Sequence, residues 1–195
     1  MKLILASSSP RRADILRDAG ISFEICAARV DETIRPNECA QAMVARLAEA
    51  KSRTAGAQIN SVGGKCVVIG ADTAIELDGK IFGKPSDAAH ASEMLAALSG
   101  RVHRVHSGIF LLRWPDGAAR AALETTSVKF AALDAHEIEA YVATGEPFGK
   151  AGGYAIQERA GRFISGIDGC YFNVVGLPLA RLCALLGELG WSDSK

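Results

Sequence analysis

Apolar residues in this chain form short continuous runs separated by helical stripes, a pattern typical of an α/β protein. Residues 2–6 are an apolar run and predict a buried strand. The serines at positions 7–9 and the following Pro10 predict a helix start, with a serine N-cap and proline at the first helical position. Gly20 is a natural end for that helix, and residues 22–27 predict a second short strand.

A longer helix is predicted over residues 37–55, where apolar side chains recur at helical spacing. The apolar positions are Ala40, Met43, Val44, Leu47 and Ala48. Lys51 continues the same stripe. A lysine aligned with an apolar helix face either keeps its charge at the rim or points into a polar cleft.

The clearest strand is residues 66–77, because its first six residues are apolar on both faces, as in a central strand. Asp78 and Gly79 then predict a hairpin that returns through residues 80–82. A helix is then expected over residues 86–100, followed by two strands, 101–114 and 119–132, that are joined by a turn. A capped helix is expected over residues 134–145 and a glycine-rich segment with a short strand near residue 163 over residues 145–169. The last helix is expected over residues 179–189.

The chain has 195 residues, of which 49% are hydrophobic, so it has ample material for a core. We expect one domain over residues 1–195, with two lobes around a central cleft and a boundary roughly at residue 100. The 22 basic and 22 acidic residues give a formal net charge of zero. A balanced chain has no overall attraction to nucleic-acid polymer or to an anionic membrane, so any anion chemistry must come from a local basic cluster.

The five cysteines are odd in number, far apart and without a CxxC pair, which argues against a disulfide framework or a zinc knuckle. The first apolar run is too short for a signal peptide, and no apolar run has the length of a membrane span. These features predict a reduced, cytoplasmic protein.

The first candidate for chemistry is the helix start at Ser8, Arg11 and Arg12. A helix N-terminus offers unpaired backbone N–H groups and the positive end of the helix dipole, and both favour phosphate. Two arginines in that first turn are unfavourable for the helix itself unless an anion compensates them. The alternative is a serine cap followed by two solvated arginines.

Asp72 is the second candidate, because a carboxylate at the end of a buried strand is expensive without a partner. Such acids often hold a metal or take a proton at a cleft, and Thr73 adds a hydroxyl beside it. The alternative is a structural aspartate satisfied by a backbone N–H or an arginine. Taken alone, Glu32 and Lys84 are better explained as solvated loop residues, and the glycine-rich segment ending at Gln157 is not a dinucleotide fingerprint. Basic groups, separated acids and a glycine loop together suit Mg²⁺-assisted phosphoryl chemistry.

Several ordered blocks of the chain resemble the Maf family, and they cover residues 3 to about 180. The blocks are Leu5-Ala6-Ser7-Ser8-Ser9-Pro10-Arg11-Arg12, Val30-Asp31-Glu32, Ala50-Lys51, Gly70-Ala71-Asp72-Thr73, Gly83-Lys84-Pro85, Leu98-Ser99-Gly100, Lys150-Ala151-Gly152-Gly153-Tyr154-Ala155-Ile156-Gln157 and Val175-Gly176-Leu177-Pro178. The resemblance implies an inosine triphosphatase-like α/β fold with a long, twisted mixed sheet. It also implies a nucleoside triphosphate pyrophosphatase that depends on Mg²⁺ or Mn²⁺ and is often dimeric.

Two features resemble the branch of this family that acts on dTTP and UTP, namely Thr73 and the segment ending in Gln157. Carried over by resemblance, Asp72 and Glu32 are the metal-side acids, with Asp72 as the base. Ser8, Arg11 and Arg12 would hold phosphates, and Lys51 and Lys84 would add positive charge. Arg11, Thr73 and Gln157 are the positions where base selectivity is expected. The alternatives are a 7-methyl-GTP pyrophosphatase and a nucleotide-binding regulator without turnover, linked to septum formation.

Overall fold

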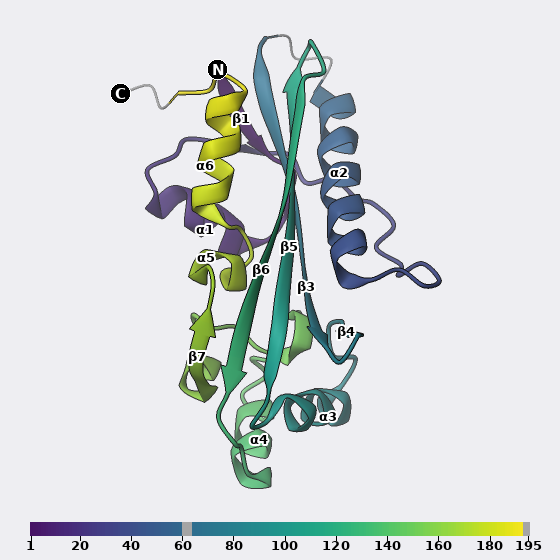
Figure 1. The fold of residues 1–195 in the computed structure, drawn as a ribbon, viewed down its shortest axis with the longest axis vertical. Helices are drawn as coiled ribbons and strands as arrows, with labels where there is room; N and C mark the ends of the chain where they lie inside the picture. Colours follow the sequence, from purple (N-terminus) through teal and green to yellow (C-terminus); the bar gives the residue numbers. More distant parts are fainter. Residues whose placement is uncertain (60–63, 193–195) are drawn as a thin grey trace.

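The computed structural model describes residues 1–59 and 64–192, and its centre is one mixed sheet (Figure 1). In these residues seven strands have the order β2-β1-β3-β5-β6-β7, with β4 paired to β3. β1 is parallel to β2 and β3, and the other pairs are antiparallel. The strands are β1 (Lys2–Leu5), β2 (Glu24–Ile25), β3 (Cys66–Leu77), β4 (Lys80–Phe82), β5 (Val102–Trp114), β6 (Ala119–Phe130) and β7 (Ile164–Asp168). The predicted α/β class with a long mixed sheet is confirmed.

Helices cover the sheet from both sides, with α2 on one face and α1 and α6 on the other (Figure 1). The α-helices are α1 (Pro10–Asp18), α2 (Ala40–Ile59), α3 (Ala88–Leu98), α4 (Ala135–Val142), α5 (Tyr171–Val175) and α6 (Leu179–Glu188). Two 3₁₀ helices, η1 (Ala151–Gly153) and η2 (Arg159–Phe163), lie in the predicted glycine-rich segment. Across residues 1–59 and 64–192, no helix combines the length and hydropathy that a bilayer crossing needs.

Local sequence signals placed most elements correctly. The hairpin forms as predicted, with Asp78 and Gly79 at φ values of 52° and 78°. The predicted capping box of α4 is also present, between Asp134 and Glu137. Some boundaries were wrong: β2 covers only two residues, and α2 begins at Ala40 because Asn37 lies in the left-handed region with φ 59°. The same helix continues to Ile59, past its predicted end at residue 55.

Two glycines let α2 lie directly on the sheet. A Cβ atom on Gly70 of β3 would come within 2.0 Å of the Ala48 carbonyl oxygen of α2. A Cβ atom on Gly108 of β5 would come within 2.4 Å of the Val44 carbonyl oxygen. Since neither glycine carries a side chain, the backbone of α2 packs directly against β3 and β5. This contact sets the distance between the residues of α2 and the sheet.

Among the described residues, two of the four apolar cores lie away from α2 and share the long strands. One core packs α1 and α6 against β1 and the first half of β3, and the other packs α3 and α4 against the second half of β3. Both cores take residues from before and after position 100. The predicted lobe boundary near residue 100 therefore does not divide them, because antiparallel β5 and β6 run through both regions.

Acid should weaken the fold before most carboxylates titrate, because His103 is buried in the second core. Only 1% of its surface is exposed, its Nε2 atom lies 2.6 Å from the Tyr154 hydroxyl, and burial lowers its pKa from 6.5 to about 4. The unfolded chain therefore binds more protons between these two values, so the free energy of unfolding falls as pH drops from 6.5 to 4. The loss should reach up to about 3 kcal/mol, and urea unfolding at successive pH values measures it.

The matched variant for this prediction is His103→Gln, whose amide can still pair with the tyrosine but does not titrate. It should flatten the dependence of stability on pH in that window. Some slope should remain, since burial also lowers the pKa of His106. An unchanged slope in His103→Gln would show that His103 does not control the acid response.

Candidate functional site

The site lies where one edge of β3 has no neighbouring strand among residues 1–59 and 64–192. β1 pairs with β3 up to Ile69, and β4 pairs with it only from Ile75 onward. Within the described residues, the stretch between those two points pairs with β5 alone. Backbone and side chains at this gap therefore face a cavity instead of another strand.

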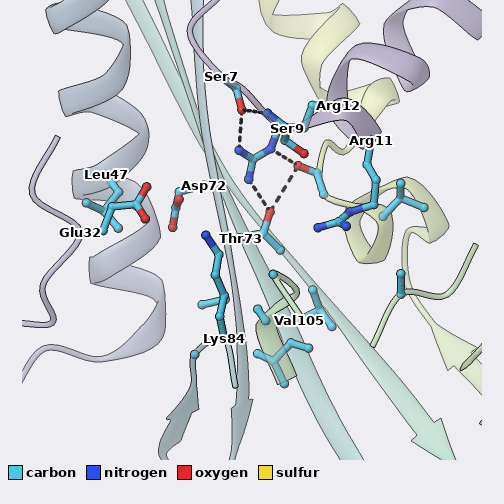
Figure 2. A pocket seen from close by; sticks show the side chains of 18 of the residues that line it. Ser7, Ser9, Arg11, Arg12, Glu32, Leu47, Asp72, Thr73, Lys84 and Val105 are labelled. Carbon is cyan, nitrogen blue, oxygen red and sulfur yellow. Dashed lines mark hydrogen bonds between the residues drawn. The ribbon is translucent and has the colours of Figure 1, made fainter. Parts of the chain in front are cut away.

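Asp72 and Thr73 sit in this gap and point to opposite faces of the sheet, as neighbours in a strand must. Asp72 faces α2, where it meets Lys51, and Thr73 faces α1, where it meets Arg12 (Figure 2). The candidate site thus has two sides, separated by the thickness of one strand.

On the α2 side, Lys51 joins the two predicted acids. Its Nζ atom lies 2.7 Å from Asp72 Oδ1 and 2.6 Å from Glu32 Oε1. Lys51 and Asp72 are buried, whereas the Glu32 side chain is 53% exposed. The hydrogen bond from Lys51 lowers the pKa of Glu32, with smaller contributions from Lys84 and Arg12, so this carboxylate is ionised near neutral pH. The sequence left two placements open for Lys51, at the rim of the helix face or pointing into a polar cleft, and the structure shows the second.

On the α1 side, a buried arginine ties three segments together. Arg12 Nε donates to the Gly176 carbonyl oxygen at 2.8 Å, and its two terminal nitrogens donate to Ser7 Oγ at 3.0 Å and Thr73 Oγ1 at 3.1 Å (Figure 2). Burial lowers the pKa of Arg12, while the nearby Asp72 carboxylate opposes that shift. At least three of its five N–H donors are therefore committed within the chain, an arrangement that the sequence did not predict.

The start of α1 has the predicted geometry without the predicted cap. Ser9 occupies the N-cap position and Pro10 follows it, but the Ser9 side chain makes no capping hydrogen bond. The Ser9 backbone N–H instead donates to Ser7 Oγ at 3.2 Å. Ser8 and Arg11 line the cavity beside this uncapped first turn. The turn can therefore offer backbone N–H groups and the positive end of its dipole to an anion.

Two further predicted residues, Lys84 and Gln157, also line the cavity. Lys84 follows β4, and its ammonium group points toward Asp72 (Figure 2). Gln157 lies in the segment after η1 and is exposed at the cavity. Gly152 holds that segment against β3 and β4: its φ is 66°, its N–H donates to the Gly83 carbonyl oxygen at 2.9 Å, and a Cβ atom there would lie 2.7 Å from Ile75 Cδ1.

All nine residues that the sequence singled out line one cavity of about 510 Å³. Its charged lining residues are four basic and two acidic side chains, which gives a formal charge of +2 from Arg11, Arg12, Lys51, Lys84, Glu32 and Asp72. The local basic cluster expected in a chain of zero net charge is therefore present at this cavity. A cavity of this size and charge suits a phosphorylated small molecule.

Sequence reasoning missed the residues that support the Arg12 side. Ser107 is fully buried and lies opposite Thr73 in the β3–β5 pairing, with their hydroxyl oxygens 2.9 Å apart. Ser7 and the Gly176 carbonyl oxygen complete the support. A polar residue inside the apolar run of β5 was a usable signal for Ser107, but pairing it with Thr73 requires the strand register.

Asp72 and Glu32 are the two carboxylates of the cavity that could hold a divalent metal. In the described part of the chain, no cluster of three or more His, Cys, Asp or Glu side chains is placed to bind one. Mg²⁺ does not require such a cluster, because proteins usually hold it with one or two carboxylates plus substrate phosphates and water. Two carboxylates beside four basic groups fit a metal that arrives with a triphosphate, and they do not fit a permanent protein-only metal cage.

Comparison with known proteins agrees with the geometry. The family model described as Maf-like protein matches residues 2–189. The chain is 46% identical to a dTTP/UTP pyrophosphatase of Pelotomaculum thermopropionicum, over 98% of each chain. It is 45% identical to a dTTP/UTP pyrophosphatase of Acinetobacter baylyi, over 93% of this chain and 96% of the relative.

Among solved structures, the Staphylococcus aureus Ham1 protein matches 67% of this chain and 72% of its own, with 15% identity and a TM-score of 0.43. These values are too low to support an inference about chemistry. The family model and the relatives instead span nearly the whole sequence, including every residue of the cavity. The chain therefore belongs to the Maf-like protein family.

Proposed function

We propose that this protein hydrolyses dTTP and UTP to the nucleoside monophosphate and pyrophosphate. The observation that carries the proposal is the two-sided cavity, with an acid pair on one face of β3 and the Thr73–Arg12 network on the other. The relatives named dTTP/UTP pyrophosphatase support the choice of substrate.

In the proposed reaction, water attacks the α-phosphorus, and the bond from that phosphorus to the oxygen bridging the α- and β-phosphates breaks. Asp72 accepts the proton of the attacking water, and pyrophosphate leaves with the bonding electrons. Lys51 and Lys84 offset the negative charge that grows on the departing group. The start of α1, with Ser8 and Arg11, holds the remaining phosphate oxygens.

We include a divalent cation in this proposal, Mg²⁺ or Mn²⁺, held by Asp72 and Glu32. When bound, it would neutralise phosphate oxygens and favour ionisation of water at the reacting phosphorus. The chain's own contribution is to keep both carboxylates close together, and Lys51 does this by contacting each of them.

We assign selectivity for the nucleobase to the side of β3 that carries Thr73. The amide of Gln157 has a donor and an acceptor, so it can pair with the O4 and N3–H of uracil or thymine. Thr73 has a single hydroxyl proton, and Ser107 and the Gly176 carbonyl oxygen both lie within hydrogen-bond distance of its Oγ1. We therefore propose that Thr73 affects selectivity by fixing Arg12 and its neighbours, whereas Gln157 contacts the base.

The test is pyrophosphate release from purified protein with Mg²⁺ or Mn²⁺, across dTTP, UTP, CTP, ATP, GTP and 7-methyl-GTP. The kcat/KM for dTTP and UTP should exceed that for ATP and GTP about 100-fold, since purines leave polar groups of the site unpaired. Best turnover of 7-methyl-GTP would assign the chain to that other activity. Nucleotide binding without release would identify a regulator.

Gln157→Ala should lower kcat/KM for UTP about 10- to 100-fold and leave kcat/KM for ATP nearly unchanged. The side chain is exposed, so this variant should fold normally. Parallel kinetics with the two nucleotides measure the ratio. An equal loss for UTP and ATP would contradict base reading by Gln157.

We also propose that the protein forms a homodimer, and the family resemblance is the only support for this. Sedimentation or light scattering on the purified chain would measure its mass in solution. A mass of about 20.5 kDa, that of one chain, would remove the dimer from the proposal.

A further inference from the structure

Glu32 belongs to a segment that has no regular secondary structure to hold it. It lies between β2 and α2, in residues 26–39, where the structure has neither helix nor strand. Its side chain is 53% exposed, yet its carboxylate meets Lys51 at 2.6 Å. A half-exposed glutamate on an irregular segment has many conformations available, so a single placement requires contacts that hold the backbone.

Arg46 of α2 supplies such contacts. Its Nε and one terminal nitrogen bind the two oxygens of Glu38 at 2.6 and 2.7 Å. The same terminal nitrogen donates to the Thr33 carbonyl oxygen at 3.1 Å. The Glu38 carboxylate in turn accepts the backbone N–H of Arg35 at 3.0 Å. One guanidinium therefore holds the segment after Glu32 at two points directly, Thr33 and Glu38, and at Arg35 through the Glu38 carboxylate.

The contacts reach Glu32 through its neighbours. Thr33 is the next residue, and its N–H donates to the Asp31 carboxylate at 2.9 Å, which closes a short turn around Glu32. Arg46 and Lys51 belong to the same helix, five positions apart or about 7.5 Å along its axis. The helix that presents Lys51 to the two acids thus also holds the backbone that presents Glu32.

We propose that Arg46 is a positioning residue for Glu32, acting through Glu38 and the Thr33 carbonyl. This inference rests on the proposed function, in which Glu32 is one of the two acids at the reacting phosphates. Arg46 does not line the cavity, so it is not placed among the groups that would meet the substrate. The role requires arginine, because its planar fork binds both Glu38 oxygens and the carbonyl together, whereas a lysine presents a single point of charge.

The experiment compares Arg46→Met and Arg46→Lys with a matched control, Arg53→Met. Arg53 is on the same helix and contacts Glu49 at 2.7 Å and the Phe110 ring, neither of which belongs to residues 26–39. Arg46→Met should lower kcat/KM for UTP about 10-fold, since a small misplacement of a reacting group is costly. Arg46→Lys should recover only part of that loss, and Arg53→Met should match the wild type.

Two readouts separate positioning from general support of the fold. In a Glu32→Gln background, Arg46→Met should cause no further loss of kcat/KM, because its partner in catalysis is already removed. An equal loss in both backgrounds would overturn the proposal.

The second readout does not depend on turnover. Amide hydrogen exchange over residues 26–39 should become faster in Arg46→Met and stay unchanged in Arg53→Met. Unchanged exchange in Arg46→Met would overturn the inference whatever the enzyme does. Failure of the wild type to cleave dTTP or UTP, with faster exchange still seen, would instead reject the proposed function alone.

Discussion

Asp72→Asn should lower the kcat of pyrophosphate release about 10³- to 10⁴-fold while nucleotide binding persists. The amide has nearly the same shape as the carboxylate but cannot accept the proton of the attacking water. Lys51 would keep its contact with Glu32, so the variant should retain its fold. Calorimetric binding of an α,β-methylene UTP analogue, measured beside turnover of UTP, separates the two effects.

The matched control is Asp78→Asn, which makes the same chemical change six residues further along, in the exposed hairpin turn. Its side chain is 69% exposed, and its one ion pair among the described residues is with Arg101, so turnover should be unaffected. Near-normal turnover in an Asp72→Asn protein that binds nucleotide would remove Asp72 from its role as the base.

Gly70→Ala should lower the free energy of unfolding by about 2–4 kcal/mol, although it adds a single methyl group. The added carbon would stand 2.0 Å from the Ala48 carbonyl oxygen and 2.8 Å from Ser52, so α2 must move away from β3. Because α2 also carries Lys51, the same shift should pull that lysine from Asp72 and reduce turnover. Urea unfolding and UTP turnover of the same preparation measure both losses.

Gly187→Ala is the control for this variant. Gly187 lies in α6, is exposed, and has no atom within 4 Å of the position its Cβ would take. Alanine is the better helix former there and should raise stability by up to about 1 kcal/mol. Wild-type stability in Gly70→Ala would mean that α2 does not rest on the sheet as described.

Features set by neighbours in sequence could be predicted before the structure. The hairpin depends on Asp78 and Gly79, and the start of α1 on Pro10, so local conformational preference decides both. Asp72 stood out because it follows an apolar run directly, where an acid without a partner is costly. The resemblance to a known family then identified nine candidate site residues, and all nine line the cavity.

The supporting contacts could not be predicted, because they depend on register and on long-range packing. Arg12 meets the Gly176 carbonyl oxygen across 164 positions of sequence, and Ser107 meets Thr73 only because β3 and β5 pair in one particular register. The short helix α5 was also missed. Five residues are too few to show a helical period, and its contacts with β5 and β6 fix it.

The opposite orientations of Asp72 and Thr73 restrict how the gene for this protein can change. One codon inserted or deleted in β3 before Asp72 would turn the acid toward α1 and its neighbour toward α2. Side chains in this strand can be exchanged one at a time, but its length upstream of the gap cannot vary by a single residue without inverting the site. Insertions and deletions should therefore be tolerated in turns such as residues 115–117, whereas a one-residue insertion or deletion in β3 before Asp72 should abolish activity.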